Sequence, residues 1–337
     1  ILSAGQIQSI LELLENQFGF QDGAEITIEV DPASISYQKL KDYLIVGINR
    51  VSLGVQSFDN YILDKIGRIH SLDDIYKCCE WLNSFYKNGD IFSWSIDLIQ
   101  NLPNQNLNHW KEQLNKAINT QVPHISVYDL SIEPGTVFEQ RQSIGKLNLP
   151  DEELSADIFR MTSLILSNAG FGRYEISNFA KPMHLSRHNR VYWGPRGWWG
   201  FGLGATSAPW GTRFTRPRTR ELYYEWVVSQ ETNGIHNSLK RCNSKPIALD
   251  DQLIVGLRRR EGVDLQLVGR NFGWSENQCE KYFNTLFSKL IPYSDSGFIE
   301  RRGWHLKLTD PLGMELSNQV LIQILLWWEK LPVDAVR

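Results

Sequence analysis

The stretch Arg50-Val-Ser-Leu-Gly-Val-Gln56 decides the fold, because apolar and polar residues alternate along it with the two-residue period of a β-strand. Val51, Leu53 and Val55 share one face, and the other face is mostly polar. The same alternation recurs at residues 25–31, 92–98 and 124–130. The sequence therefore predicts four strands that are each apolar on one face and polar on the other.

Helical patterns separate these strands, over residues 59–66, 72–85 and 107–118. Strands that alternate with helices predict βα units and a parallel sheet. Central parallel strands are usually apolar on both faces, so a polar face is typical of a barrel with a solvated or ligand-filled lumen. The alternative is a half-exposed sheet whose polar face meets water, and the intervening helices make it less favourable.

Polar residues also mark the C-terminal ends of the predicted strands, which is where β/α barrels carry their active sites. The residues nearest those ends are Glu29, Asp31, Gln56, Asp97 and Tyr128. We therefore expect a ligand site at this end of the sheet.

Composition describes an ordinary globular chain of 337 residues, long enough for a large core and an accessory domain. The net charge of −3 gives no global attraction to nucleic acid or anionic membranes. No apolar run reaches the roughly 18 residues of a membrane helix, although transient membrane association stays open. The opening segment lacks the basic start of a signal peptide. The cysteine usage favours a cytoplasmic location.

The four cysteines carry no metal-binding or disulfide signature. Cys78 and Cys79 are adjacent in a helical pattern, while Cys242 and Cys279 are isolated. No pair has the C-x-x-C spacing of a metal site, and a reducing compartment suits this usage.

A separate C-terminal domain follows a predicted linker at residues 243–246. Helices near 249–257 and 276–290, a hairpin over 298–308 and a final apolar helix predict a winged-helix-like α+β domain. The helix near 276–290 has only Lys281 and Lys289 as bases, against Glu276 and Glu280. Because a helix that reads DNA is normally more basic, we expect no nucleic-acid partner and interpret the domain as a lid or partner-docking module.

Four motifs share their order and spacing with one known group of proteins. They are Glu25-Ile-Thr-Ile-Glu29-Val-Asp31-Pro32, Asn49-Arg-Val-Ser-Leu-Gly-Val-Gln56-Ser-Phe58, Gly67-Arg68-Ile-His70 and Ser95-Ile-Asp97-Leu-Ile. With them the chain resembles the radical S-adenosylmethionine proteins related to oxygen-independent coproporphyrinogen oxidase. Tyr174-Glu-Ile-Ser-Asn-Phe-Ala180 and Arg187-His188-Asn-Arg-Val-Tyr-Trp193 resemble the signature of the heme chaperones in that group, the HemW family.

The resemblance implies an α/β fold with a partial parallel (β/α) barrel of the radical S-adenosylmethionine type. It also implies that Glu29, Gln56, Arg68 and Asp97 line an S-adenosylmethionine site. Carboxylates accept hydrogen bonds from ribose hydroxyls and the methionyl ammonium, and an arginine pairs with the methionyl carboxylate. The plain alternatives are a solvated helix-end arginine for Arg68 and a strand-end cap for Asp97.

The chain also departs from the family pattern. Family members hold a 4Fe–4S cluster with a C-x-x-x-C-x-x-C loop that precedes the segment corresponding to Ile1, and the cysteines present do not supply that triad. We therefore expect the front strands and cluster-binding segment to be missing, no metal ligands for the cluster in this chain, and no cleavage of S-adenosylmethionine. Asn101 stands where glycine is usual, and Thr206 stands where histidine is frequent.

The heme-type motif implies that His188 ligates heme iron, with a glycine- and aromatic-rich loop at residues 198–205 beside it. Arginines near it in the sequence are candidates for pairing with heme propionates: Arg187, Arg190, Arg196, Arg213, Arg216 and Arg218. In the alternative, His188 is a structural histidine and the arginines form a solvated face.

These expectations divide the chain into an incomplete barrel at 1–180, a heme-motif and connecting region at 181–245 and a winged-helix-like domain at 246–337. The leading hypothesis is a cytoplasmic heme chaperone that binds heme and S-adenosylmethionine and passes heme to an acceptor protein. The second is an oxygen-independent coproporphyrinogen III oxidase that performs radical decarboxylation, although no turnover is expected without the cluster segment. A third is a regulatory or partner-binding remnant without a cluster.

Overall fold

The computed structural model describes residues 2–194, 197–209, 213–233, 247–333 and 335, which fall into two compact units. The first unit comprises Ile1–Leu185 and the second Ser186–Arg337. The predicted linker at 243–246 lies outside the described residues, and the division of the second half at residue 245 stays a prediction.

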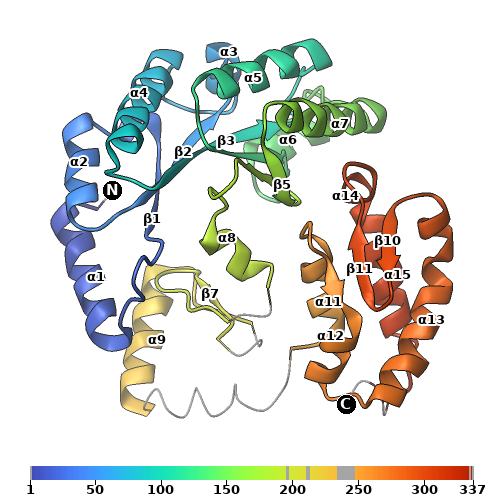
Figure 1. Ribbon diagram of the computed structural model, residues 1–337. Coiled ribbons are helices and arrows are strands. Elements are labelled where there is room, and N and C mark those ends of the chain that lie inside the picture. The colour runs from blue at the N-terminus through green and yellow to red at the C-terminus, as the bar shows by residue number, and fades with distance from the viewer. Residues whose placement is uncertain (1, 195–196, 210–212, 234–246, 334, 336–337) are drawn as a thin grey trace. The chain divides into compact units, whose positions relative to one another are not determined.

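A six-stranded sheet in the order β1-β2-β3-β4-β6-β5 forms the centre of the first unit (Figure 1). Four strands run parallel, at β1 (Thr27–Val30), β2 (Arg50–Gln56), β3 (Ser93–Gln100) and β4 (His124–Asp129). Next to β4 lies β6 (Asn178–Ala180), which runs antiparallel and pairs in turn with β5 (Gly172–Glu175). The prediction of a mostly parallel sheet built from the four alternating stretches is confirmed.

Helices surround this sheet, and polar side chains fix where most of them begin. They are α1 (Ala4–Phe18), α2 (Tyr37–Ile45), α3 (Asn60–Lys65), α4 (Leu72–Asn88), α5 (Leu107–Asn119), α6 (Val137–Ser143) and α7 (Glu152–Asn168), with the 3-10 helix η1 at Pro32–Ser34. Ser3 and Ser71 start α1 and α4 with full capping boxes, in which a side chain at the third helical residue bonds back to the cap.

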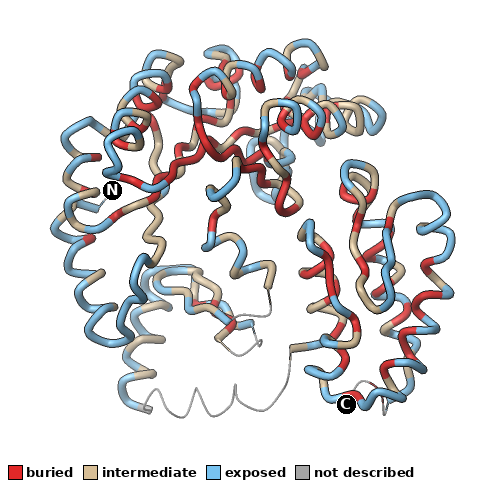
Figure 2. The backbone as a smooth tube through the Cα atoms, in the orientation of Figure 1, coloured by how far each residue is buried: buried red, intermediate tan, exposed pale blue. Residues whose placement is uncertain are grey.

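The apolar residues of the parallel strands are buried. Figure 2 shows buried residues along β2 and β3. Val51, Leu53 and Val55 have no exposed surface, and neither do Trp94 and Ile96 on the next strand. Their burial beneath α4 and α5 removes a large apolar area from water, which is the main force holding sheet and helices together.

The opposite face is polar, and strand register aligns its residues. Glu29 pairs with Ser52, and Ser52 pairs with Ser95, so these side chains emerge on the same face. The hydroxyl oxygens of Ser52 and Ser95 are 2.8 Å apart. At one end of the sheet, β1 pairs only with β2 within the described part of the chain.

The second unit begins with a short helix and a small hairpin. Its elements are α8 (Arg187–Tyr192), the antiparallel pair β7 (Thr206–Ser207) and β8 (Phe214–Thr215), and α9 (Arg220–Asn233).

The rest of this unit is an α+β domain with winged-helix-like topology. Its elements are α11 (Leu249–Leu257), β9 (Val263–Asp264), α12 (Leu265–Phe272), α13 (Glu276–Asp295), β10 (Ile299–Arg302), β11 (His305–Leu308), α14 (Leu312–Glu315) and α15 (Ser317–Trp328). The three strands form an antiparallel sheet in the order β10-β11-β9, which confirms the predicted hairpin. In the described ranges of both units, every helix is too short or too polar to span a bilayer.

Candidate functional site

Asp97 lies at the centre of the polar face, near the end of β3. The Ser52 hydroxyl donates to its carboxylate, at 2.9 Å to Oδ2 and 3.1 Å to Oδ1. Burial raises the pKa of Asp97 above its ordinary value; hydrogen bonds from Ser126 and Ser52 oppose this shift, and the charge of Glu29 adds to it. Glu29 and Asp97 therefore share one face and interact electrostatically, as the predicted site requires.

Gln56 ends β2 in a tight three-residue turn. Its φ is 65°, and the Ser57 N–H donates to the Val55 carbonyl oxygen at 2.8 Å. A turn of this kind with a positive central φ is rare and strained for a residue other than glycine. The Gln56 amide folds back over Gly54, where an added Cβ would lie 3.1 Å from Nε2. Glycine at position 54 thus leaves room for Gln56 on the polar face.

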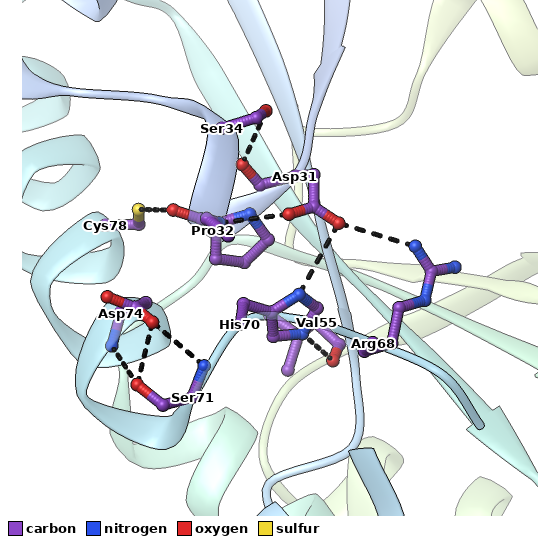
Figure 3. Close-up of polar contacts among 10 residues, drawn as sticks. Asp31, Pro32, Ser34, Val55, Arg68, His70, Ser71, Asp74 and Cys78 are labelled. Carbon is purple, nitrogen blue, oxygen red and sulfur yellow. Dashed lines mark hydrogen bonds and ion pairs between the residues drawn. The ribbon is translucent and has the colours of Figure 1, made fainter. Parts of the chain in front are cut away.

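Arg68 reaches the end of β1 through an ion pair with Asp31, drawn in Figure 3. Its Nη1 lies 3.4 Å from Asp31 Oδ2, and the same oxygen lies 3.4 Å from Nδ1 of His70. The other ring nitrogen of His70 donates to the Val55 carbonyl at 3.2 Å. His70 and Ser52 are residues to which the sequence assigned no role, although both lie inside the quoted motifs.

The four predicted cofactor-binding residues thus lie around the C-terminal ends of three neighbouring strands. Glu29 and Asp97 supply carboxylates, Gln56 an amide and Arg68 a guanidinium. This set can recognise hydroxyl, ammonium and carboxylate groups of one polar ligand. Their individual roles stay predictions.

Asn101 stands where the resemblance implies glycine, and its backbone adopts a conformation that suits glycine. Its φ is 62°, in the left-handed region that glycine adopts freely and asparagine tolerates. The side chain donates from Nδ2 to Asp129 Oδ1 at 2.8 Å, which ties the loop after β3 to the end of β4. The asparagine is therefore accommodated by a local hydrogen bond.

The cysteines that the structure describes do not fit an iron–sulfur cluster. Cys78 and Cys79 are buried side by side in α4, where burial raises the pKa of Cys78 to about 12 and also raises that of Cys79. Cys279 is buried in the second unit, and Cys242 lies outside the described residues. Cluster ligands must be thiolates, and within the described ranges no three metal-binding side chains come together.

His188 lies exposed on α8, a helix that Ser186 caps by accepting a bond from the Asn189 N–H at 3.1 Å. Its ring meets the Tyr192 ring edge-on, with centroids 4.9 Å apart. Tyr192 in turn meets Trp198 at 5.0 Å, so a chain of aromatic contacts leads from His188 to the glycine-rich loop. The exposure of His188 differs from the buried position expected of a structural histidine.

The predicted propionate-binding arginines occupy different environments. Arg190 pairs with Glu261 at 2.6 Å, and Arg213 with Asp251 at 3.4 Å. Arg216 is buried: its guanidinium lies over the rings of Phe201 and Trp226 and donates to Ser207 Oγ at 2.8 Å. Arg216 is therefore part of the interior and not of a binding face, whereas Arg187 and Arg218 are exposed and Arg196 lies outside the described residues.

The glycine-rich loop presents three large apolar side chains to solvent. Trp199, Phe201 and Leu203 are 39%, 59% and 51% exposed and alternate with glycines. A Cβ at Gly200 would lie 2.4 Å from the Thr206 carbonyl oxygen, so the backbone here packs too closely for any other residue. Clustered exposed apolar side chains of this kind mark binding surfaces.

A cavity of about 120 Å³ lies beside this loop, lined by Tyr192, Trp193 and Trp198 and by residues of α11 and α12. Cavities of about 150 Å³ hold a single benzene ring, so a porphyrin does not enter this one.

Comparisons with known proteins agree with these features. The model of the radical SAM superfamily matches residues 3–117. The heme chaperone HemW of Synechocystis sp. is 37% identical, over 94% of this chain and 77% of that protein. The heme chaperone HemW of Lactococcus lactis is 32% identical, over 97% of this chain and 82% of that protein.

A solved structure shares the fold. The coproporphyrinogen III oxidase HemN from Escherichia coli superposes with a TM-score of 0.75, at 23% identity, over 96% of this chain and 74% of that one. Together with identities above 30% along most of the sequence, this likeness places the polar strand ends in a radical SAM fold. The chain belongs to the HemW family of heme chaperone-like proteins within the radical SAM superfamily.

Proposed function

We propose that this protein binds heme and S-adenosylmethionine and transfers heme to an acceptor protein. The observation that carries the proposal is the exposed His188, joined through Tyr192 and Trp198 to a loop of exposed apolar side chains. Heme needs an axial ligand, an apolar surface for its ring and cations for its propionates. This segment offers all three, because Arg187 and Arg218 lie exposed near it in the sequence.

The superfamily relation implies S-adenosylmethionine and a 4Fe–4S cluster as cofactors. Bound S-adenosylmethionine would supply a sulfonium group, and a cluster would supply an electron. In this chain Glu29 and Asp97 would hold hydroxyl or ammonium groups, Arg68 the carboxylate and Gln56 a further polar group. The described cysteines do not fit the cluster, so the proposal concerns binding of S-adenosylmethionine alone.

The acceptor protein is unidentified, and the C-terminal α+β domain at 246–337 is the proposed lid or docking module for it. A cytoplasmic location remains our prediction from the sequence. The free, buried cysteines of the described residues are compatible with a reducing compartment.

Heme titration of the purified chain tests the proposal. We expect hemin to bind with a defined Soret band, and His188→Ala to shift that band and weaken binding, because an axial imidazole sets the ligand field of the iron. His305→Ala is the matched control, since His305 is a partly exposed histidine of the same unit. A His188→Ala protein whose heme spectrum equals that of the wild type would contradict ligation by His188.

The fold shared with HemN keeps oxidation of coproporphyrinogen III as the second candidate. An anaerobic decarboxylation assay with a reductant and S-adenosylmethionine separates the two. Turnover by this chain would overturn the chaperone proposal, and heme transfer to an apo-protein without turnover would support it.

A further inference from the structure

We propose that His70 and Asp31 are positioning residues for the S-adenosylmethionine site, where they hold the strained turn at Gln56 and the guanidinium of Arg68. The inference rests on the proposed function, because it assumes that S-adenosylmethionine is the ligand of these strand ends. It assigns roles to two residues that are not predicted to contact the ligand but that lie next to the predicted ligand-binding residues Gln56 and Arg68.

The turn at Gln56 is held from two sides. The Val55 carbonyl oxygen accepts the Ser57 N–H at 2.8 Å and His70 Nε2 at 3.2 Å. The first bond closes the turn, and the second ties it to the segment between α3 and α4. Strained backbone persists only where the surroundings over-determine it, and such strain concentrates at functional sites. The bond from His70 is thus the tertiary contact that keeps Gln56 over Gly54.

His70 is suited to this task because its side chain is fully buried. A carbonyl oxygen can only accept, so Nε2 carries the proton in this bond. Ile69 lies between Arg68 and His70 in the sequence, and its side chain is exposed. The side chains of Arg68 and His70 both point towards Asp31 (Figure 3). The Arg68 N–H donates to the Leu63 carbonyl at 2.9 Å, which fixes this segment on the end of α3.

Asp31 links the two predicted contacts. Its Oδ1 accepts the Ala33 N–H at 3.0 Å and caps η1, so the carboxylate has a fixed orientation. Its Oδ2 accepts a hydrogen bond from Arg68 Nη1 at 3.4 Å. The same oxygen lies 3.4 Å from His70 Nδ1, which makes no hydrogen bond among the described residues and forms an ion pair only when the ring is protonated. Among the described residues, the Arg68 guanidinium has no other polar contact, so the rest of it can form a bidentate pair with a ligand carboxylate. One carboxylate therefore orients Arg68 directly and lies beside the imidazole that holds the Gln56 turn.

Calorimetric binding of S-adenosylhomocysteine to the purified chain tests the role of His70. Glutamine places an N–H near the position of Nε2, whereas asparagine does not reach it. We expect His70→Asn to weaken binding about tenfold, the scale of one hydrogen bond, and His70→Gln to stay within about threefold of the wild type. Equal affinities for the wild type and His70→Asn would overturn the proposal.

A double-mutant cycle separates positioning from general stability. If His70 acts through Gln56, the loss caused by His70→Asn should disappear when Gln56→Ala is already present. Additive losses in the cycle would overturn the proposal, and thermal unfolding of each variant identifies any protein that fails to fold. If His70→Asn fails to fold, the affinity of His70→Gln can still be compared with that of the wild type, and the two should agree within about threefold.

Methylthioadenosine, which lacks the methionyl amino acid group, tests the role of Asp31. In Asp31→Asn an amide N–H would face Arg68 and displace it, so we expect a larger loss for S-adenosylhomocysteine than for methylthioadenosine. Tighter S-adenosylhomocysteine binding by Asp31→Asn would mean that Asp31 competes with the ligand, which contradicts positioning. If the wild type binds neither compound, the S-adenosylmethionine part of the proposed function fails as well, and this outcome differs from failure of the variants alone.

Discussion

The strand ends of the first unit and the His188 segment of the second are built in opposite ways. Asp97, Gln56 and Arg68 are each held by a neighbour: a serine hydroxyl, a backbone turn and a carboxylate. His188 and Leu203 instead project from a short helix and a glycine-rich loop, with much of their surface in solvent. The first region is organised before any ligand arrives, whereas the second displays apolar surface that a ligand would cover.

This difference indicates two modes of binding. A pre-organised polar site loses little conformational freedom on binding and depends on each hydrogen bond. An exposed apolar surface gains affinity from the area that the ligand removes from water, spread over several side chains. Single substitutions should therefore have larger effects at the strand ends than at the loop.

The largest effect is expected for Asp97→Ala on binding of S-adenosylhomocysteine. Loss of a hydrogen bond to a charged carboxylate should weaken binding by about 1–3 kcal/mol, measured by calorimetry. Hemin affinity should not change. Asp90→Ala, which removes an exposed carboxylate of the same unit, serves as the control. A loss of hemin binding in Asp97→Ala would mean that the two regions do not act separately.

A smaller effect is expected for Leu203→Ser on hemin binding. Leu203 is 51% exposed, so covering it with a porphyrin contributes about 1 kcal/mol. The Soret band should keep its position, because the axial ligand is unchanged. Leu222→Ser is the matched control, since Leu222 is exposed to a similar extent, 53%, on α9 of the same unit. If both variants bind hemin like the wild type, the glycine-rich loop is not the apolar contact surface.

The smallest effect is expected for Asp97→Asn on the pH dependence of unfolding. Burial raises the pKa of Asp97 in the folded protein, so the folded state keeps a proton that the unfolded state releases. The contribution of Asp97 to the free energy of unfolding therefore falls as the pH rises from the pKa of an ordinary aspartate through the raised pKa of the folded protein. Urea unfolding between pH 4 and 8 should show a weaker decline in the free energy of unfolding for Asp97→Asn. A steeper decline in the variant would contradict the shift.

Much of the first unit could be predicted because its signals are local. The alternation of Val51, Leu53 and Val55 identified β2 with its observed bounds, and the same period located β3 and β4. The face and strand end that carry Glu29 and Asp97 followed from parity alone. In the second unit, the hairpin predicted over residues 298–308 is formed by β10 and β11.

Other features depend on tertiary contacts that no local pattern encodes. The strands β5 and β6 are three or four residues long and almost wholly buried, so they show no alternation. Glutamine normally avoids a positive φ, so no pattern in the sequence predicts one at Gln56. The burial of His70 depends on contacts with Val55 and Asp31, which are distant in the sequence. Arg216 could not be told from its exposed neighbours, because its burial requires Trp226 from another element.

The position of β1 at the end of the sheet has a consequence for handling the protein. Within the described residues its outer backbone groups meet no other strand, and an unpaired strand edge can accept a further strand from any suitable segment. Glu29 stands on this strand, and its charge opposes such addition. Neutralising Glu29 to study cofactor binding would thus also remove a safeguard against aggregation. Light scattering belongs beside every affinity measured on such a variant.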